Sequence, residues 1–418
     1  MDAAVERQVG TGPGANAEDG GWYLDAAATA PLRSEARAAM LEVLAGDAAN
    51  ASSVHQAGYR ARVTLDRARS DIAVSFGARE SDLVFTSGGT EANNLAIIGL
   101  ALARPRGRHI VTTPIEHPSV LESCRYLERV FGFDLDFAPV DPGGRVLIEP
   151  FERLLRDDTT LVSVGLANAE VGTVQDVPRL AAAARARGAL VHSDAVQAAP
   201  SLPVEFGREP GGDEWPGLGV DALSVAAHKF GGPQGAGALF VRGGLALEPL
   251  LHGGGQEGGR RSGTENVAAI AGFAAAVRAS RENVGRRAAE VMASRDALVT
   301  RVLAAIPSAR LTGDPEERLP GHASFVFPGV SGESLLVALD AAGVAASSGS
   351  ACAAGHDGPS EALLALGMPA ELADTAVRFT LPGPIPEPVV ERIVRVISAE
   401  VEAGGLMRRP QPGAGGSA

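Results

Sequence analysis

Short apolar runs alternate with helical patterns along the middle of the chain. Each run is continuous rather than alternating, which is typical of strands buried on both faces of a sheet. The expected strands are Leu83–Thr86, His109–Thr113, Leu161–Leu166, Leu190–Ser193, Ala222–Val225 and Gly237–Val241. Helical stretches lie between them, such as Pro178–Arg187, which begins with a proline and ends before Gly188. The pattern predicts an α/β fold with a mostly parallel sheet covered by helices.

Helical patterns predominate on both sides of this region. We expect helices at 34–44, with Ser34 as its N-cap, and at 56–76, 267–280, 282–306, 333–342, 360–366 and 387–403. Two more strand-like runs, Ala323–Phe327 and Ala376–Thr380, lie among the later helices. A chain of 418 residues exceeds the roughly 250–300 residues at which a single core stops growing. We therefore expect a second, smaller α+β domain in the C-terminal part.

Polar side chains follow four of the predicted strands. They are Glu116 and His117, then Asn168, then Asp194 and Gln197, and finally His228 and Lys229. In an open parallel sheet, ligands bind beyond the carboxyl ends of the strands. We therefore expect these side chains to surround one site, because chance explains one polar residue at each strand end more readily than this combination.

A glycine-rich turn, Ser87-Gly88-Gly89-Thr90, joins the first predicted strand to a helix. Free backbone N–H groups and the helix dipole attract anions at such a junction, and Thr90 adds a hydroxyl donor. The turn predicts a phosphate site, although many such turns are only connections.

Lys229 is the only lysine among 37 Lys and Arg residues. Arginine supplies charge but does not readily lose its proton, whereas a buried lysine amine can act as a nucleophile. A single lysine beside a Gly-Gly-Pro turn therefore suggests a Schiff base, for which pyridoxal phosphate is the commonest reason. A codon bias that replaces lysine with arginine is the alternative explanation.

Composition excludes several classes of partner. A net charge of −13 and an aromatic content of 4% argue against a surface for nucleic acid or anionic membrane. No apolar run reaches the roughly 18 residues of a membrane span. The two cysteines, Cys124 and Cys352, form no disulfide framework, so we expect a cytoplasmic protein.

Motifs spread along most of the chain carry a family resemblance. They are Asn50–His55, Thr86–Asn94, Glu116–Pro118, Asp194–Gln197, Ala227–Lys229, Arg261–Asn266 and Ser347–Cys352. In this combination and order the chain resembles the NifS/IscS-like cysteine desulfurases, in the class V aminotransferase group of fold-type I pyridoxal phosphate enzymes.

The resemblance also implies a division of the chain. A large cofactor-binding domain would span 36–272, with a mostly parallel seven-stranded sheet covered by helices. A small α+β domain would span 273–405 and associate with residues 22–35. Composition, not the resemblance, predicts the two ends: residues 1–21, rich in Gly and Ala, would form a flexible leader, and residues 406–418, rich in Pro, Gly and Ser, a disordered tail.

The same resemblance gives roles to the cofactor-facing residues. Lys229 would bind pyridoxal phosphate and later move the α-proton of the substrate. Asp194 would pair with the pyridine nitrogen, and Gln197 with the phenolic oxygen. His117 would stack on the ring and could carry a proton, which makes it a catalytic residue beside Lys229 and Cys352.

Other residues would hold the phosphate and the substrate. Gly89, Thr90 and His228 would bind the phosphate, and Thr264 would reach in from the partner subunit of a homodimer. Arg378 would bind the substrate carboxylate as a bidentate fork.

Cys352 distinguishes this chemistry from plain transamination. Gly349 and Gly355 flank it in a stretch of small residues suited to a mobile loop. The resemblance implies that its thiolate takes sulfur from L-cysteine as a persulfide, releases alanine and passes the sulfur to an acceptor protein. Cys124 is expected to be an inert, buried thiol.

Two positions depart from the family pattern. The asparagine expected near the cofactor falls at Ala169, so either Asn168 takes over that contact or the contact is missing. The serine usually found three residues before the lysine is Ala226. Each lost hydrogen bond costs about 0.5–1.5 kcal/mol, or about 1.5–3 kcal/mol if it served a charged group. The role of His356, four residues after Cys352, is left open.

Three functions are consistent with these residues. The first is an L-cysteine desulfurase that supplies sulfur for Fe–S clusters, thiolated tRNA or another thio-cofactor. The second is a selenocysteine lyase, or a lyase or aminotransferase for another amino acid. The third is a catalytically weakened scaffold or regulator of sulfur transfer, as the alanines at 169 and 226 would allow. No metal site is expected.

Overall fold

A seven-stranded sheet forms the centre of the computed structural model, which describes residues 15–16, 21–46, 49–103, 105–206, 217–348 and 358–407. The strand order is β3-β9-β8-β7-β6-β4-β5. Only β9 runs antiparallel to its neighbours, and the remaining adjacent pairs are parallel. Its members are β3 (Leu83–Thr86), β4 (His109–Thr112), β5 (Asp134–Phe137), β6 (Thr159–Ser163), β7 (Leu190–Asp194), β8 (Ala222–Ala226) and β9 (Gly237–Val241). The predicted α/β fold and mostly parallel sheet are confirmed.

Helices cover both faces of this sheet because every strand directs alternate apolar side chains to opposite sides. Val84 packs in the core beneath α3 and α4, whereas its neighbours Leu83 and Phe85 pack in the core beneath α2, α6 and α7. The helices are α1 (Ser34–Ala45), α2 (Gln56–Ser75), α3 (Gly89–Ala103), α4 (Pro118–Phe131), α5 (Ile148–Leu154), α6 (Val177–Ala186), α7 (Val267–Arg281), α8 (Val284–Ala305), α9 (Gly332–Ala341), α10 (Glu361–Ala365), α11 (Ala370–Ala373) and α12 (Glu387–Met407).

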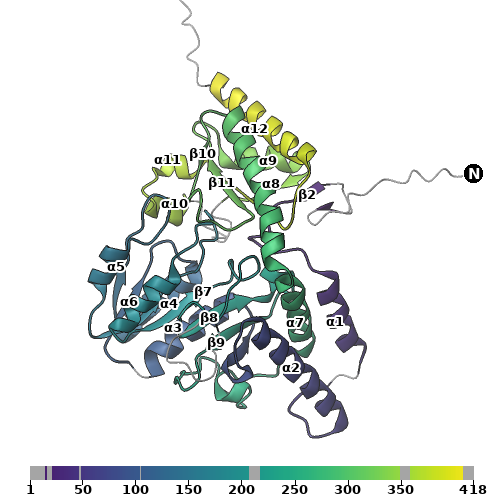
Figure 1. Cartoon of the computed structure of the whole chain (residues 1–418), viewed down its shortest axis with the longest axis vertical. Coiled ribbons are helices and arrows are strands. Elements are labelled where there is room, and N and C mark those ends of the chain that lie inside the picture. The colour runs from purple at the N-terminus through teal and green to yellow at the C-terminus, as the bar shows by residue number, and fades with distance from the viewer. Residues whose placement is uncertain are drawn as a thin grey trace, which may run out of the picture.

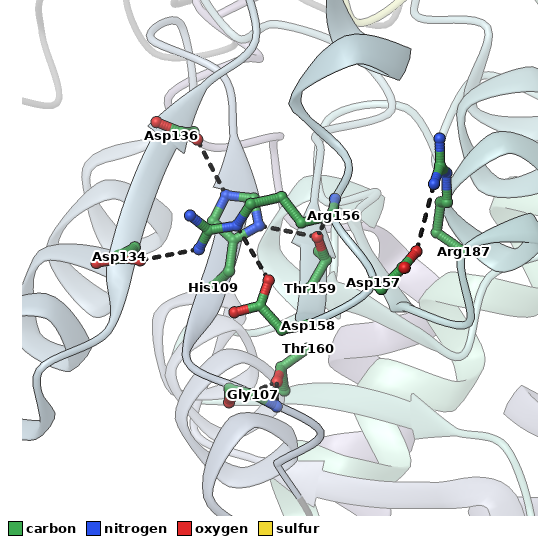
Figure 2. A network of polar contacts seen from close by, with 10 residues as sticks. All are labelled: Gly107, His109, Asp134, Asp136, Arg156, Asp157, Asp158, Thr159, Thr160 and Arg187. Carbon is green, nitrogen blue, oxygen red and sulfur yellow. Dashed lines mark hydrogen bonds and ion pairs between the residues drawn. The ribbon is translucent and has the colours of Figure 1, made fainter.

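The edge strand β5 was not predicted, because its sequence Asp-Leu-Asp-Phe contains no apolar run. Besides its main-chain pairing with β4, polar side-chain contacts hold it to the sheet (Figure 2). The ring of His109, at the start of β4, lies 3.1 Å from Asp136 and 2.8 Å from Thr159. Arg156 pairs with Asp134 at 2.9 Å. The cluster lies at the amino ends of β4 and β6. The polar residues predicted to form the site lie at the opposite, carboxyl ends of the strands.

A second core lies around a small antiparallel sheet in the C-terminal part. Its strands are β10 (Arg310–Leu311), β11 (His322–Val326) and β13 (Ala376–Thr380). Figure 1 shows α8 running from α7 to this part, where α12 packs against α8 and α9. The expected strands and helices of this region are present, as the smaller α+β domain requires.

The N-terminal segment joins this second core. Strand β2 (Gly21–Tyr23) pairs with β12 (Val344–Ala345) and with β1 (Ala15–Asn16), and Leu24 is buried among the side chains of the second core. Residues 21–24 therefore pack with the C-terminal part, whereas the backbone N–H groups of Ala30 and Arg33 donate to His228 and Gly231 after β8. The association of residues 22–35 with the small domain and the domain boundaries stay predictions.

Helix α1 begins at the predicted place but without the predicted cap. Arg33 occupies the N-cap position, and Ser34 lies inside the helix with its hydroxyl donating to Glu35. The N-cap prediction was therefore wrong, although the helix was right. Among the described residues, no helix is long and apolar enough to cross a membrane.

Candidate active site

A cavity of about 260 Å³ lies beyond the carboxyl ends of the parallel strands. It brings together most of the predicted site residues, namely Gly89, Thr90, His117, Asn168, Asp194, Gln197, His228, Lys229 and Arg378. Thr264 is exposed and does not line this cavity of its own chain. Cys352 and His356 lie outside the described residues, so their roles stay predictions.

Lys229 follows β8 in a short 3₁₀ helix that ends at Gly231 in the left-handed region. Its amine donates to the carbonyls of Ala27 and Ala28. Gln197 also donates to the carbonyl of Ala27, at 2.9 Å. The N-terminal segment therefore forms one wall of the cavity and positions both side chains.

Asp194 ends strand β7, and two donors orient its carboxylate. Oδ1 accepts from the backbone N–H of Val196 at 2.9 Å, and Oδ2 accepts from Nδ2 of Asn93 at 2.7 Å. A carboxylate held in this way offers its remaining lone pairs to a cation or an N–H donor in the cavity.

His117 is the N-cap residue of α4, and Pro118 occupies the first turn. Its Nδ1 accepts from the backbone N–H of Ser119 at 3.1 Å and lies 2.7 Å from Oγ of the same residue. The ring is therefore tied to the start of the helix through one nitrogen while it lines the cavity.

Helix α3 starts at the glycine-rich turn, as predicted for an anion site. A Cβ atom on Gly89 would lie 2.8 Å from Cγ2 of Val196, so only glycine permits this close approach. Glu91 accepts from the backbone of Ser87 at 2.7 Å and from Arg261 at 2.8 Å. These bonds stabilise the turn and leave the helix N-terminus facing the cavity.

His228 lines the cavity beside the N-terminal wall. Its Nδ1 is 3.3 Å from the hydroxyl of Thr29. Burial, together with the neighbouring Lys229, lowers the pKa of His228 to about 4. The imidazole is therefore neutral near pH 7 and can donate one N–H to an anion.

Arg378 enters the cavity from β13 and is almost completely buried, at 1% exposed. It forms an ion pair with Asp25 at 2.8 Å and donates to the carbonyl of Ala169 at 3.1 Å. Its Nε has no hydrogen-bond partner among the described residues. An unpartnered buried donor on a guanidinium is suited to an incoming carboxylate.

Asn168 lines the cavity, but its side chain is already engaged with the backbone. Its carbonyl oxygen accepts from the N–H groups of Glu170 and Val171, and its amide donates to Ile115. These bonds shape the turn after β6. The prediction that Asn168 contacts a cofactor stays untested, and Ala169 and Ala226 also line the cavity.

Two half-buried glutamates line the cavity wall: Glu116, which was expected near the site but was given no role, and Glu170, which the sequence reasoning missed. Glu116 accepts from the hydroxyl of Thr113 at 2.7 Å and from the backbone of Gly165 at 2.8 Å, yet burial raises its pKa to about 7. Burial also raises the pKa of Glu170 to about 6, although it accepts from Ser360. Glu116 belongs to a quoted motif, and its place before His117 was the available signal.

Comparisons with known proteins link the chain to one family. A family model described as aminotransferase class V matches residues 22–381. A Dictyoglomus turgidum protein named cysteine desulfurase IscS is 42% identical over 360 residues, which cover 86% of this chain and 89% of that protein. A solved NifS-like protein has a TM-score of 0.82 and 33% identity, with 91% and 99% of the two chains covered. A structure of SspA in complex with cysteine has a TM-score of 0.74 and 30% identity, with 87% and 99% covered.

Proposed function

We propose that this chain, which belongs to the class V aminotransferase family and to the cysteine desulfurases within it, converts L-cysteine to L-alanine and takes up the released sulfur. The observation that carries the proposal is the convergence of Lys229, Asp194 and Arg378 on one cavity. The similar protein SspA has been solved with cysteine, which supports a substrate of this size and class.

The cavity residues fit pyridoxal phosphate. The N-terminus of α3 and the close approach at Gly89 would hold a phosphate, with neutral His228 beside it. Asp194 is oriented to accept from a ring N–H, and Lys229 supplies the amine. The chemistry that the cofactor supplies when bound is an electron sink for the charge that develops at the substrate α-carbon.

The chain's own side chains would bind and orient the substrate. Arg378 would take the carboxylate on its unpartnered Nε edge. Lys229 would carry the α-proton at Nζ, and His117 would contact the face of the bound ring. Gln197, which shares the Ala27 carbonyl with Lys229, would donate to the phenolic oxygen.

Sulfur transfer would end on Cys352. Its thiolate attacks the sulfur of the bound cysteine, an S–S bond forms and the C–S bond breaks. The electron pair of the C–S bond goes to carbon, which gains a proton and becomes the methyl group of alanine. The transferred sulfur is oxidised to the sulfane level and the carbon is reduced, so no external oxidant is needed. The thiolate of an acceptor then attacks the outer sulfur, which forms an acceptor persulfide and returns Cys352 to the thiol; with a small-molecule dithiol in place of the acceptor, a second thiol attack forms a disulfide and releases sulfide.

The assembly around this reaction is part of the proposal. The chain would act as a cytoplasmic homodimer in which Thr264 reaches the partner's cofactor, and it would deliver persulfide sulfur to an acceptor for Fe–S clusters, thiolated tRNA or another thio-cofactor. The large domain would span 36–272, and the small domain, which carries Cys352, would span 273–405.

The two cysteines provide a matched test. Cys352→Ala should abolish alanine and sulfide release from L-cysteine with a reductant, while the absorbance of bound pyridoxal phosphate is retained. Cys124→Ala should keep both, because Cys124 is buried and its pKa is raised to about 12 by burial. Full turnover by the Cys352 variant would refute the persulfide step.

Lys229→Ala tests the cofactor assignment separately. It should remove both the visible absorbance and the turnover. A wild-type protein that stays colourless with added pyridoxal phosphate would instead support the scaffold function. A screen of L-cysteine, L-selenocysteine and other amino acids separates the desulfurase from the lyase and aminotransferase alternatives.

A further inference from the structure

A chain of hydrogen bonds leads from Asp194 to His117 through Asn93 and Ser119. Nδ2 of Asn93 donates to Oδ2 of Asp194 at 2.7 Å and to Oγ of Ser119 at 2.9 Å. Oγ of Ser119 lies 2.7 Å from Nδ1 of His117. The linking side chains come from α3 and α4, which pack together, and both are buried, with Asn93 1% and Ser119 8% exposed.

In this row of hydrogen bonds, two groups can each take only one role, as donor or as acceptor. The backbone N–H of Ser119 can only donate, and it points to Nδ1 of His117 at 3.1 Å. Nδ1 must therefore be the acceptor, and the proton of the neutral ring is on Nε2. At the other end an ionised Asp194 can only accept, so the amide of Asn93 must present its nitrogen to it.

The positions of the remaining hydrogens are fixed by the two groups at the ends of this row, Nδ1 of His117 and the carboxylate of Asp194. Asn93 uses its two amide hydrogens for Asp194 and for Ser119. Oγ of Ser119 is then an acceptor toward Asn93, and its own hydrogen is directed to Nδ1 of His117. Oδ1 of Asn93 is buried without a partner among the described residues, so the two donated bonds alone hold this amide.

We infer that Asn93 and Ser119 are positioning residues that keep His117 in the tautomer with its proton on Nε2 and that link this tautomer to the carboxylate of Asp194. The chemical use of this arrangement rests on the proposed function. His117 would offer an N–H donor at Nε2 rather than a lone pair. Such a donor suits a substrate or product group with negative charge, such as a thiolate or selenolate, and it would stabilise that group beside the ring.

The position of the ring proton is measurable without substrate. Protein labelled with ¹⁵N-histidine can be studied by NMR with and without pyridoxal phosphate, with the His117 signals assigned by their loss in His117→Gln. At neutral pH we expect an unprotonated Nδ1 and a protonated Nε2 in both forms. A proton on Nδ1 in the wild-type protein would overturn the inference.

The variants separate positioning from simple packing. Ser119→Ala and Asn93→Leu should each shift the Nδ1 resonance and populate the second tautomer, and Ser119→Thr, which keeps the hydroxyl, should restore the wild-type spectrum. Ser123→Ala is the matched control, since it removes a buried hydroxyl one turn later in α4 that, among the described residues, donates to the Ser119 carbonyl at 2.7 Å. If the Nδ1 resonance of Ser119→Ala matches that of Ser123→Ala, the inference fails. This test does not depend on Asn93→Leu, which need not fold.

Turnover provides the second measurement. With L-cysteine, kcat of Ser119→Ala should fall about tenfold, less than the roughly 100-fold lost with a general acid itself, whereas Ser123→Ala should match the wild type. An unchanged kcat in Ser119→Ala would refute the link to catalysis. Absence of turnover in the wild type, combined with the expected spectra, would refute the proposed function and leave the tautomer assignment intact.

Discussion

Asp25 and Arg378 form an ion pair of 2.8 Å in the wall of the cavity. The arginine side chain is 1% exposed and the aspartate side chain 18% exposed. The charge of Arg378 is therefore balanced before any ligand arrives, and a substrate carboxylate would join an existing pair. This arrangement keeps a buried cation in place in the free protein.

Asp25→Asn removes the negative charge that balances Arg378 and should destabilise the protein. Removal of one partner from a buried pair leaves the other charge uncompensated, so the free energy of unfolding should fall by about 3 kcal/mol. Saturating L-alanine should recover part of the loss, because its carboxylate replaces the missing charge. Denaturant unfolding with and without alanine measures both effects.

The control for this variant is an exposed pair. Glu387 contacts Arg301 on the surface of the C-terminal part, with about half of each side chain exposed. Glu387→Gln should change stability by less than about 1 kcal/mol. Equal losses in the two variants would show that Asp25 does not act through the burial of Arg378.

Gly89→Ala should weaken phosphate binding by steric displacement of α3. The new Cβ would meet Cγ2 of Val196 at 2.8 Å, so the helix N-terminus must move away from the cavity. Loss of one hydrogen bond to a charged phosphate should lower cofactor affinity about tenfold or more. Titration of the apoprotein with pyridoxal phosphate measures the change.

Adding Val196→Ala to Gly89→Ala tests whether the steric contact with Val196 causes the weaker binding. It removes the atom that the new Cβ would meet, so the double variant should regain most of the affinity, while Val196→Ala alone should bind normally. Additive losses in the double variant would rule out the clash as the mechanism.

Ala226→Ser should tighten cofactor binding. Ala226 ends β8, is fully buried and lines the cavity, so a hydroxyl there can reach a bound phosphate. One added hydrogen bond to a charged phosphate, worth about 1.5–3 kcal/mol, corresponds to a gain in affinity of roughly tenfold or more. Ala222→Ser, at the other end of the same strand, should give no gain. Equal affinities of Ala226→Ser and the wild type would show that this alanine costs the site nothing.

The stability of the protein should fall between about pH 4.5 and 7 in a way that depends on Glu116. Burial raises the pKa of this carboxyl from 4.5 to about 7. A raised folded-state pKa gives stability that is full below the unfolded value and is lost as pH rises through the folded value. The loss should reach about 3 kcal/mol.

Glu116→Gln should remove this slope, because the amide does not titrate. The measurement is the difference between wild-type and variant unfolding free energies across the pH range, in which His192 and other titrating groups cancel. A difference that is constant with pH would contradict the assignment.

Strands whose apolar runs are continuous were predictable from the sequence, because burial on both faces leaves that pattern. Strand β5 was not, since Asp134 and Asp136 bind Arg156 and His109 from other segments. The residues at the strand ends, such as Asp194 and Lys229, were predictable from topology, which places all parallel carboxyl ends at one edge.

The pairings that complete the site were not predictable. Asp25 and Arg378 are 353 positions apart in the chain, and Glu170 meets Ser360 across 190 positions. Neither contact leaves a local pattern. Asn93 lay within a quoted motif, but its role depends on the distance between α3 and β7, which only the folded chain defines.

The N-terminal wall of the cavity has a consequence for the order of events during synthesis. Ala27 and Ala28 hold Lys229, while Asp25 pairs with Arg378 and bridges to Thr380 of the same strand. A chain emerges from the ribosome N-terminus first, so the large sheet can assemble before β13 is made. The segment around Asp25, however, can complete its contacts only after β13, with Arg378, has been synthesised. The ability to retain a cofactor and a substrate is thus acquired late, and a nascent chain that stops before Arg378 would hold the sheet without the finished site.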